Sequence, residues 1–78
     1  MEVQKAFKIR IKQLCNERNL SINKLATLSG IEPSTLSSIV NGKSKNPKME
    51  TVINICAGLN MRLSDFFNDE IFEDIKID

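Results

Sequence analysis

Apolar residues recur along this chain at helical spacing, in segments separated by short polar breaks. In the first segment, Val3, Phe7, Ile11 and Leu14 stand at i, i+4, i+8 and i+11. This is the repeat of one face of an amphipathic helix, which we predict over about residues 2–18. Four further helices follow from the same kind of pattern, so we expect an all-α fold.

The second helix is predicted to span about eight residues after Ser21, which is a good N-cap. Gly30 ends it, because glycine readily adopts the left-handed conformation found at many helix C-termini. The residues expected on its buried side are Ile22, Leu25, Ala26 and Leu28.

The third helix is expected to begin at Pro33, whose missing N–H costs nothing in a first turn, and to stop at Asn41-Gly42. At 100° per residue, Leu36, Ile39 and Val40 gather on one side. The other faces carry small polar side chains: Ser34, Ser38 and Asn41 opposite, with Thr35 and Ser37 flanking them.

A fourth helix ending near Asn60 is predicted from an apolar stripe of Met49, Val52, Ile53, Cys56 and Leu59, and a short fifth from Leu63, Phe66 and Phe67. Residues 69–78 are consistent with a last helical turn, a strand or a frayed end. We therefore divide the chain into a domain at 1–68 and an acidic, apolar tail at 69–78. The tail is expected to pack on a partner subunit, to fold back on its own domain or to be disordered.

The middle of the chain has the spacing of a helix-turn-helix. Ala26 stands four residues before Gly30, and Leu36 and Ile39 stand six and nine residues after it. In this motif the second helix, here about residues 33–41, enters the major groove of DNA. We therefore predict duplex DNA as the main partner, although any three-helix bundle can contain such a turn.

Charge is distributed unevenly around a net charge of +1. Residues 1–64 carry ten Lys/Arg and four Asp/Glu, a balance of +6, while residues 65–78 have a balance of −5. The basic part suits contact with phosphate, and the acidic end is expected to stay away from it.

Other functional classes find little support in the composition. There is no histidine, and Cys15 and Cys56 lack metal-ligand spacing, so we expect no metal, no cofactor and no enzyme activity. We interpret Cys56 as a small buried hydrophobe and Cys15 as a reduced thiol at the edge of an apolar face.

No apolar run has the length of a membrane span or of a signal peptide, so we expect a cytoplasmic protein without membrane contact. The sequence shows no appended sensory domain, so we expect no small-molecule effector.

From about residue 7 to residue 67, the chain resembles the Cro and lambda-repressor-like helix-turn-helix family, also called the XRE family. The resemblance implies a compact five-helix domain that binds operator DNA, usually as a homodimer, to regulate transcription. The segments that carry it are 10–14, 21–26, 30–31, 35–39, 41–43, 46–47, 53, 56–59 and 63–67.

The resemblance also assigns roles to matching positions. Positions from which relatives reach base edges are occupied here by Pro33, Ser34, Thr35 and Ser38. Contact with the DNA backbone is implied for Arg10, Ile22, Asn23, Ser37, Asn41, Lys43 and Lys45, although the two lysines also suit a solvated loop. Hydroxyls act as donors or acceptors and discriminate bases poorly, so we expect unusual dependence on phosphate contacts and DNA shape.

Two positions depart from the family pattern. Some relatives pair an acidic residue with the arginine that matches Arg10, but Val40 occupies that place here. Arg10 is therefore free to contact phosphate, or bonds to the carbonyls of a helix end. Arg62 replaces a Ser or Thr cap, which puts the start of the fifth helix in doubt.

Together these features indicate a small bacterial or phage transcriptional regulator, most simply a repressor. The alternative is an antitoxin or anti-regulator whose C-terminal segment binds another protein and whose DNA binding serves autoregulation. The candidate residues for a dimer surface are Phe66, Phe67, Ile71 and Phe72, with Phe66 alternatively a core residue.

Overall fold

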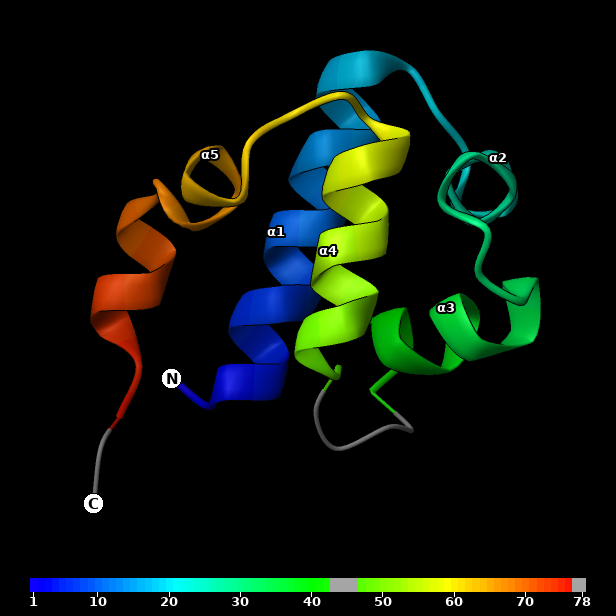
Figure 1. Ribbon diagram of the computed structural model, residues 1–78. Coiled ribbons are helices and arrows are strands. Elements are labelled where there is room, and N and C mark those ends of the chain that lie inside the picture. The colour runs from blue at the N-terminus through cyan, green and yellow to red at the C-terminus, as the bar shows by residue number, and fades with distance from the viewer. Residues whose placement is uncertain (43–46, 77–78) are drawn as a thin grey trace.

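The computed structural model describes residues 1–42 and 47–76. In this part of the chain, five α-helices and one 3-10 turn follow one another: α1 (Val3–Arg18), α2 (Ile22–Ser29), α3 (Pro33–Val40), α4 (Met49–Gly58), α5 (Leu63–Phe67) and η1 (Glu70–Asp74). The predicted all-α, five-helix fold is confirmed. In Figure 1, α2 and α3 lie to one side of α1 and α4, and α5 and η1 lie to the other. Among the described helices, none is both long and apolar enough to cross a membrane.

The ends of α2 and α3 lie where the local signals predicted them. Ser21 Oγ accepts a hydrogen bond of 3.0 Å from the Lys24 backbone N–H at the start of α2. Gly30 has φ +67° at its end, and Gly42 has φ +75° after α3. Both glycines occupy the left-handed region, where a side chain would be strained. The turn between α2 and α3 is therefore specified by residues within it.

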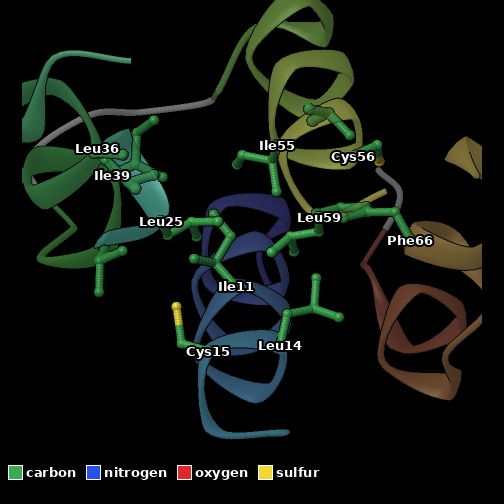
Figure 2. Packing of buried hydrophobic residues seen from close by; sticks show 13 residues of the cluster. Ile11, Leu14, Cys15, Leu25, Leu36, Ile39, Ile55, Cys56, Leu59 and Phe66 are labelled. Carbon is green, nitrogen blue, oxygen red and sulfur yellow. The ribbon is translucent and has the colours of Figure 1, made fainter. Parts of the chain in front are cut away.

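A single hydrophobic core joins the helices (Figure 2). Leu25, Ala26 and Leu36 are fully buried, and Ile39 and Val40 nearly so, as the pattern predicted. The side chain of the fully buried Ala26 ends at Cβ, and so small a side chain suits the close packing of α2 against its neighbours, α3 among them. The core therefore holds α3 by its apolar side.

The predicted apolar faces of α2 and α4 are partly wrong. Leu28 is 43% exposed, and Met49 and Ile53 are exposed as well, whereas Ile55 is fully buried. The cause lies in a close contact between the two helices at Gly58. A Cβ atom there would lie 2.7 Å from the Leu28 carbonyl oxygen, so the helix backbones meet at this point. In this packing Ile55 is fully buried and Leu28 lies at the rim of the core.

The described part of the C-terminal tail, residues 69–76, folds back on its own chain, which is the second of the three alternatives. η1 packs against α1, and the Met1 ammonium donates to the Asp74 carbonyl oxygen at 2.7 Å. The Lys76 N–H donates to the Met1 carbonyl oxygen at 2.9 Å. Phe72 lies with its ring centroid 5.7 Å from that of Phe7. The start and end of the described chain thus hold each other.

The candidate dimer residues lie in and around this aromatic cluster. Phe66 is fully buried, so its assignment to a dimer surface is wrong and the core alternative holds. Its ring centroid lies 5.1 Å from that of Phe67 and 5.9 Å from that of Phe72. Phe67 and Phe72 are half-buried against the core, and Ile71 is half-buried too. Phe66, Phe67 and Phe72 therefore pack together within one copy of the chain, and a dimer surface at the half-exposed Phe67, Ile71 and Phe72 stays a prediction.

Both cysteines are buried free thiols. Burial raises the pKa of the Cys15 thiol, and burial together with the nearby charge of Asp65 raises that of Cys56. A raised pKa keeps each thiol protonated near neutral pH and therefore weakly nucleophilic. Cys56 is a core residue, as expected, and Cys15 lies deeper than the edge position predicted for it.

Candidate nucleic-acid interface

α3 presents a polar side to solvent while its apolar side is held in the core. Pro33, Ser34 and Thr35, in its first turn, are exposed, and Ser38 is half-buried. Leu36 and Ile39 hold the helix from behind. An α-helix with its side chains is about 10–12 Å across, and the major groove of B-DNA is about 12 Å wide. The exposed side therefore has the size and the donor and acceptor groups for contact with base edges.

The N-terminus of α2 offers backbone groups more than side chains. Ile22 is half-buried against the core, so its side chain is largely occupied. Asn23 is exposed, and its carbonyl oxygen accepts a bond of 3.1 Å from Thr27 Oγ1. The first N–H groups of a helix lack intrahelical partners and favour anions. Contact with phosphate at this end would use the Asn23 side chain and these N–H groups.

At the other end of α3, two predicted phosphate-contacting side chains touch each other. Asn41 Nδ2 donates to Ser37 Oγ over 3.1 Å. The bond leaves the Ser37 hydroxyl proton free to be donated elsewhere, since the oxygen acts here as acceptor. Asn41 is exposed and Ser37 half-buried. Lys43 and Lys45 lie outside the described residues.

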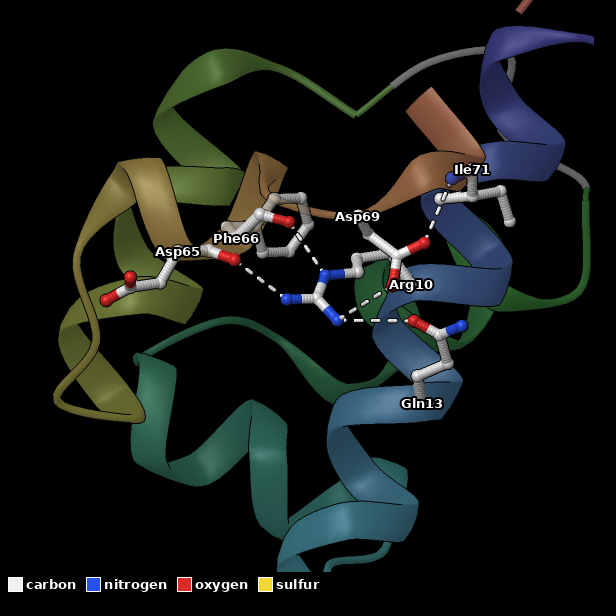
Figure 3. Close-up of polar contacts among 6 residues, drawn as sticks. All are labelled: Arg10, Gln13, Asp65, Phe66, Asp69 and Ile71. Carbon is white, nitrogen blue, oxygen red and sulfur yellow. Dashed lines mark hydrogen bonds and ion pairs between the residues drawn. The ribbon is translucent and has the colours of Figure 1, made fainter. Parts of the chain in front are cut away.

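Arg10 is not available to phosphate, and its assignment as a DNA-backbone contact is corrected (Figure 3). The residue is 7% exposed. Its Nε donates to the Phe66 carbonyl oxygen at 2.7 Å and its Nη2 to that of Asp65 at 2.8 Å. Nη1 donates to Gln13 Oε1 at 3.2 Å and lies 3.6 Å from Asp69 Oδ2. The guanidinium thus ties α1 to the end of α5, which is the helix-end alternative.

The start of α5 does not need a Ser or Thr cap. The Arg62 backbone N–H donates to Asp65 Oδ2 at 3.1 Å, so the acidic side chain in the first turn closes the helix end. The signal was present in the sequence as an acidic residue three positions after Arg62.

Sequence reasoning did not single out Lys48, which is exposed at the start of α4. It borders a groove of about 360 Å³ between the turn that precedes α3 and the first turns of α4. Thr35 lines the same groove, together with the acidic residues Glu32 and Glu50. The available signal was the run of lysines in the sequence at positions 43, 45 and 48. The two carboxylates outnumber Lys48, so the charged groups that line this groove have a net charge of −1, and the groove as a whole does not attract phosphate.

The acidic and sulfur-bearing side chains were also compared with the pattern of a metal site. Within residues 1–42 and 47–76, no group of three or more His, Cys, Asp or Glu side chains is placed to hold a metal ion. The chemistry on offer around α3 is hydrogen bonding by hydroxyl, amide and backbone groups, which suits recognition of a polar ligand.

Comparison with known proteins supplies the family. The Cro/C1-type HTH DNA-binding domain matches residues 10–70. The chain is 38% identical over 55 residues, 70% of its length, to the HTH-type transcriptional regulator RghRB of Bacillus subtilis (strain 168). It is 36% identical over 56 residues, 72% of its length, to the HTH-type transcriptional repressor RghR of the same organism. These matches cover 40% and 42% of the two relatives, so the chain spans about two fifths of their length. No solved structure matches the chain significantly. The matched span contains α2, the turn at Gly30 and α3, and the chain belongs to the Cro/C1-type helix-turn-helix family of DNA-binding domains.

Proposed function

We propose that this chain regulates transcription by binding a duplex operator with α3 in the major groove, in the simplest case as a repressor that blocks polymerase. The observation that carries this proposal is the orientation of α3. Its polar first turn, Pro33 to Thr35, is exposed, while Leu36 and Ile39 fix the helix to the core. The two relatives from Bacillus subtilis, one named as a transcriptional regulator and the other as a transcriptional repressor, support the same function.

Base recognition is assigned to four side chains of α3: Pro33, Ser34, Thr35 and Ser38. Hydroxyls accept or donate and make no bidentate contact with adenine or guanine, so each base position contributes little selectivity. Pro33 and the Thr35 methyl group supply apolar contact to a thymine methyl. Affinity is therefore expected to come mainly from the DNA backbone, and sequence preference partly from DNA shape.

Backbone contacts are assigned on both sides of α3. On one side, the N-terminus of α2 contributes Ile22 through its N–H and Asn23 through its side chain. On the other, Ser37 and Asn41 act as a bonded pair, with Lys43 and Lys45 following in the sequence. Such contacts hold the protein in register on the duplex without reading sequence.

A second copy of the chain completes the proposed regulator. One module of this kind buries only about 600–1,000 Å² of protein surface on DNA, which limits selectivity. Two copies on half-sites about 34–36 Å apart double the contacts. We therefore propose that the active form on the operator is a homodimer.

Selection of binding sites from random duplex DNA at stated salt concentrations tests this function. Ser34→Ala is expected to change the selected sequence at one or two positions, because it removes a hydroxyl that faces base edges. Lys43→Ala is the matched comparison: it should weaken all sequences alike and reduce the slope of log K against log salt by about 1. Failure to enrich any sequence, or a sharply defined G-rich consensus, would contradict the proposal.

A further inference from the structure

Glu32 is a single charged side chain at the start of α3. From residue 25 to residue 42, a segment that includes the turn at Gly30 and the whole of α3, it is the only Asp, Glu, Lys or Arg. It is exposed and directly precedes Pro33, the first residue of the helix. The α3 side chains assigned to base recognition carry only hydroxyl or apolar groups. The Glu32 carboxylate is therefore the strongest hydrogen-bond acceptor among the side chains at this end of α3.

The fold uses the backbone of Glu32 and leaves its carboxylate open. The carbonyl oxygen accepts from the Thr35 and Leu36 N–H groups at 3.0 and 3.2 Å, which starts the helix. A side chain at an N-cap often accepts from the first turn as well, but Glu32 makes no such bond. Among the described residues, no cation forms an ion pair with it, although Lys48 lines the same groove. Both carboxylate oxygens are thus available to a ligand.

The backbone around Glu32 is also fixed in position. On one side, the Ile31 N–H donates to the Ala26 carbonyl oxygen at 3.0 Å, which ties the turn to α2. On the other side, α3 is held in the core by Leu36. In a helix-turn-helix, the N-terminal residues of the second helix contact base edges. A carboxylate fixed at this place meets the floor of the major groove together with the first turn of α3.

A carboxylate there selects bases by rejection as well as by attraction. In the major groove, guanine presents the acceptors N7 and O6, and thymine presents the acceptor O4, whereas cytosine presents the N4 amino donor. Opposite an acceptor, the carboxylate loses water without gaining a hydrogen bond, which costs affinity. The net charge of −1 around the groove that Glu32 lines offers no compensation from phosphate. Cytosine is therefore the base that relieves this cost most directly.

We propose that Glu32 is a specificity-determining residue, whose carboxylate accepts a hydrogen bond from the N4 amino group of a cytosine in the major groove. This inference rests on the proposed function and deepens it, because it names a base that the start of α3 selects. It adds one discriminating contact to a helix whose hydroxyls discriminate poorly. Each half-site is thus expected to contain a cytosine opposite the start of α3 and to exclude thymine and guanine there.

Selection from random duplex DNA with wild type, Glu32→Gln and Glu50→Gln tests this assignment. Glutamine makes a bidentate contact with adenine, so Glu32→Gln is expected to exchange the selected cytosine for adenine at one position per half-site. Glu50→Gln is the matched control, because it removes the same charge from the same groove but lies on α4. It should still select the cytosine. Both residues are exposed, and circular dichroism checks that each variant is folded.

Binding to defined duplexes measures the size of the preference. Replacing the cytosine by thymine should weaken the binding of wild type and of Glu50→Gln by about tenfold, and that of Glu32→Ala by less than about twofold. A duplex with N4-methylcytosine at this position keeps the base pair but lacks the amino hydrogen in the major groove. Wild type should therefore bind it about tenfold more weakly than the unmodified duplex, while Glu32→Ala should not distinguish the two.

Three results would overturn the inference and leave the proposed function standing. They are a wild-type consensus without such a cytosine, an unchanged consensus for Glu32→Gln, and equal losses of wild type and Glu32→Ala on the thymine duplex. In these cases Glu32 only favours the helix N-terminus by its charge. Loss of the cytosine in Glu50→Gln would overturn it too, since net charge would then be the source of the preference. If wild type selects no sequence at all, the proposed function itself fails, and this inference fails with it.

Discussion

The outer side of α3 and the surroundings of Arg10 are both rich in polar groups but use them in opposite ways. On α3, Ser34 and Thr35 are exposed. Around Arg10, a nearly buried guanidinium donates to two backbone carbonyls and lies near Asp69. Polar groups that the fold satisfies internally contribute to stability, whereas those left open to solvent are available to a ligand. The surroundings of Arg10 are therefore a structural site, and the outer side of α3 is the candidate binding surface.

The largest expected effect is at the buried end. Arg10→Met removes a charged donor and leaves the Phe66 and Asp65 carbonyls without it, so the free energy of unfolding should fall by about 2–4 kcal/mol. Urea unfolding measures the change. Lys12→Met, on an exposed position of the same helix, is the control and should alter stability by less than about 0.5 kcal/mol. Equal losses in the two variants would remove the contrast between satisfied and open polar groups.

A smaller and different effect is expected at the DNA-facing end. Asn41→Ala removes a solvent-exposed hydrogen bond to Ser37, so stability should change by less than about 1 kcal/mol. Affinity for DNA should fall by up to about tenfold, because the pair no longer presents the Ser37 hydroxyl in a fixed position. Parallel urea unfolding and DNA-binding measurements separate the two quantities. A large loss of stability with unchanged affinity would make Asn41 a structural residue like Arg10.

The smallest expected effect concerns the two thiols. Each has a pKa raised above its ordinary value of 9.0 in the folded chain, so the folded state holds these protons more tightly than the unfolded state does. Their contribution to stability is complete below pH 9 and is lost as the pH rises above it. Urea unfolding at pH 7.5 and at pH 10 should show this decline. A variant with both cysteines replaced by alanine should show a smaller one; an identical decline would exclude the thiols as its source.

Helix ends were predictable because their causes are local. Ser21, Gly30 and Pro33 act within a few residues of the positions they occupy, through a hydrogen bond, a positive φ and a fixed φ. The apolar side of α3 was predictable for a similar reason, since Leu36, Ile39 and Val40 form one face and the remaining residues are small and polar. The helix-turn-helix motif and the resemblance to its family could therefore be predicted from these segments alone.

The faces of α4 were not predictable in the same way. Its sequence places apolar residues on more than one side, and the spacing of Met49 and Ile53 is as regular as that of Val52 and Ile55. Periodicity alone cannot decide between them. The packing of α4 against the other helices decides: Gly58 lies close to the backbone of α2, Ile55 is fully buried, and Met49 and Ile53 are exposed.

The order of helices, the turn at Gly30 and the hydroxyl-bearing side of α3 were determined by the sequence itself, because capping, backbone conformation and periodicity act over a few residues. The partners of Arg10, the burial of Phe66 and the exposure of Ile53 were decided only by the tertiary structure. Each depends on groups far away in the chain: the carbonyls that Arg10 reaches are 55 and 56 residues distant. Such contacts exist only once the helices have packed, and no local pattern encodes them.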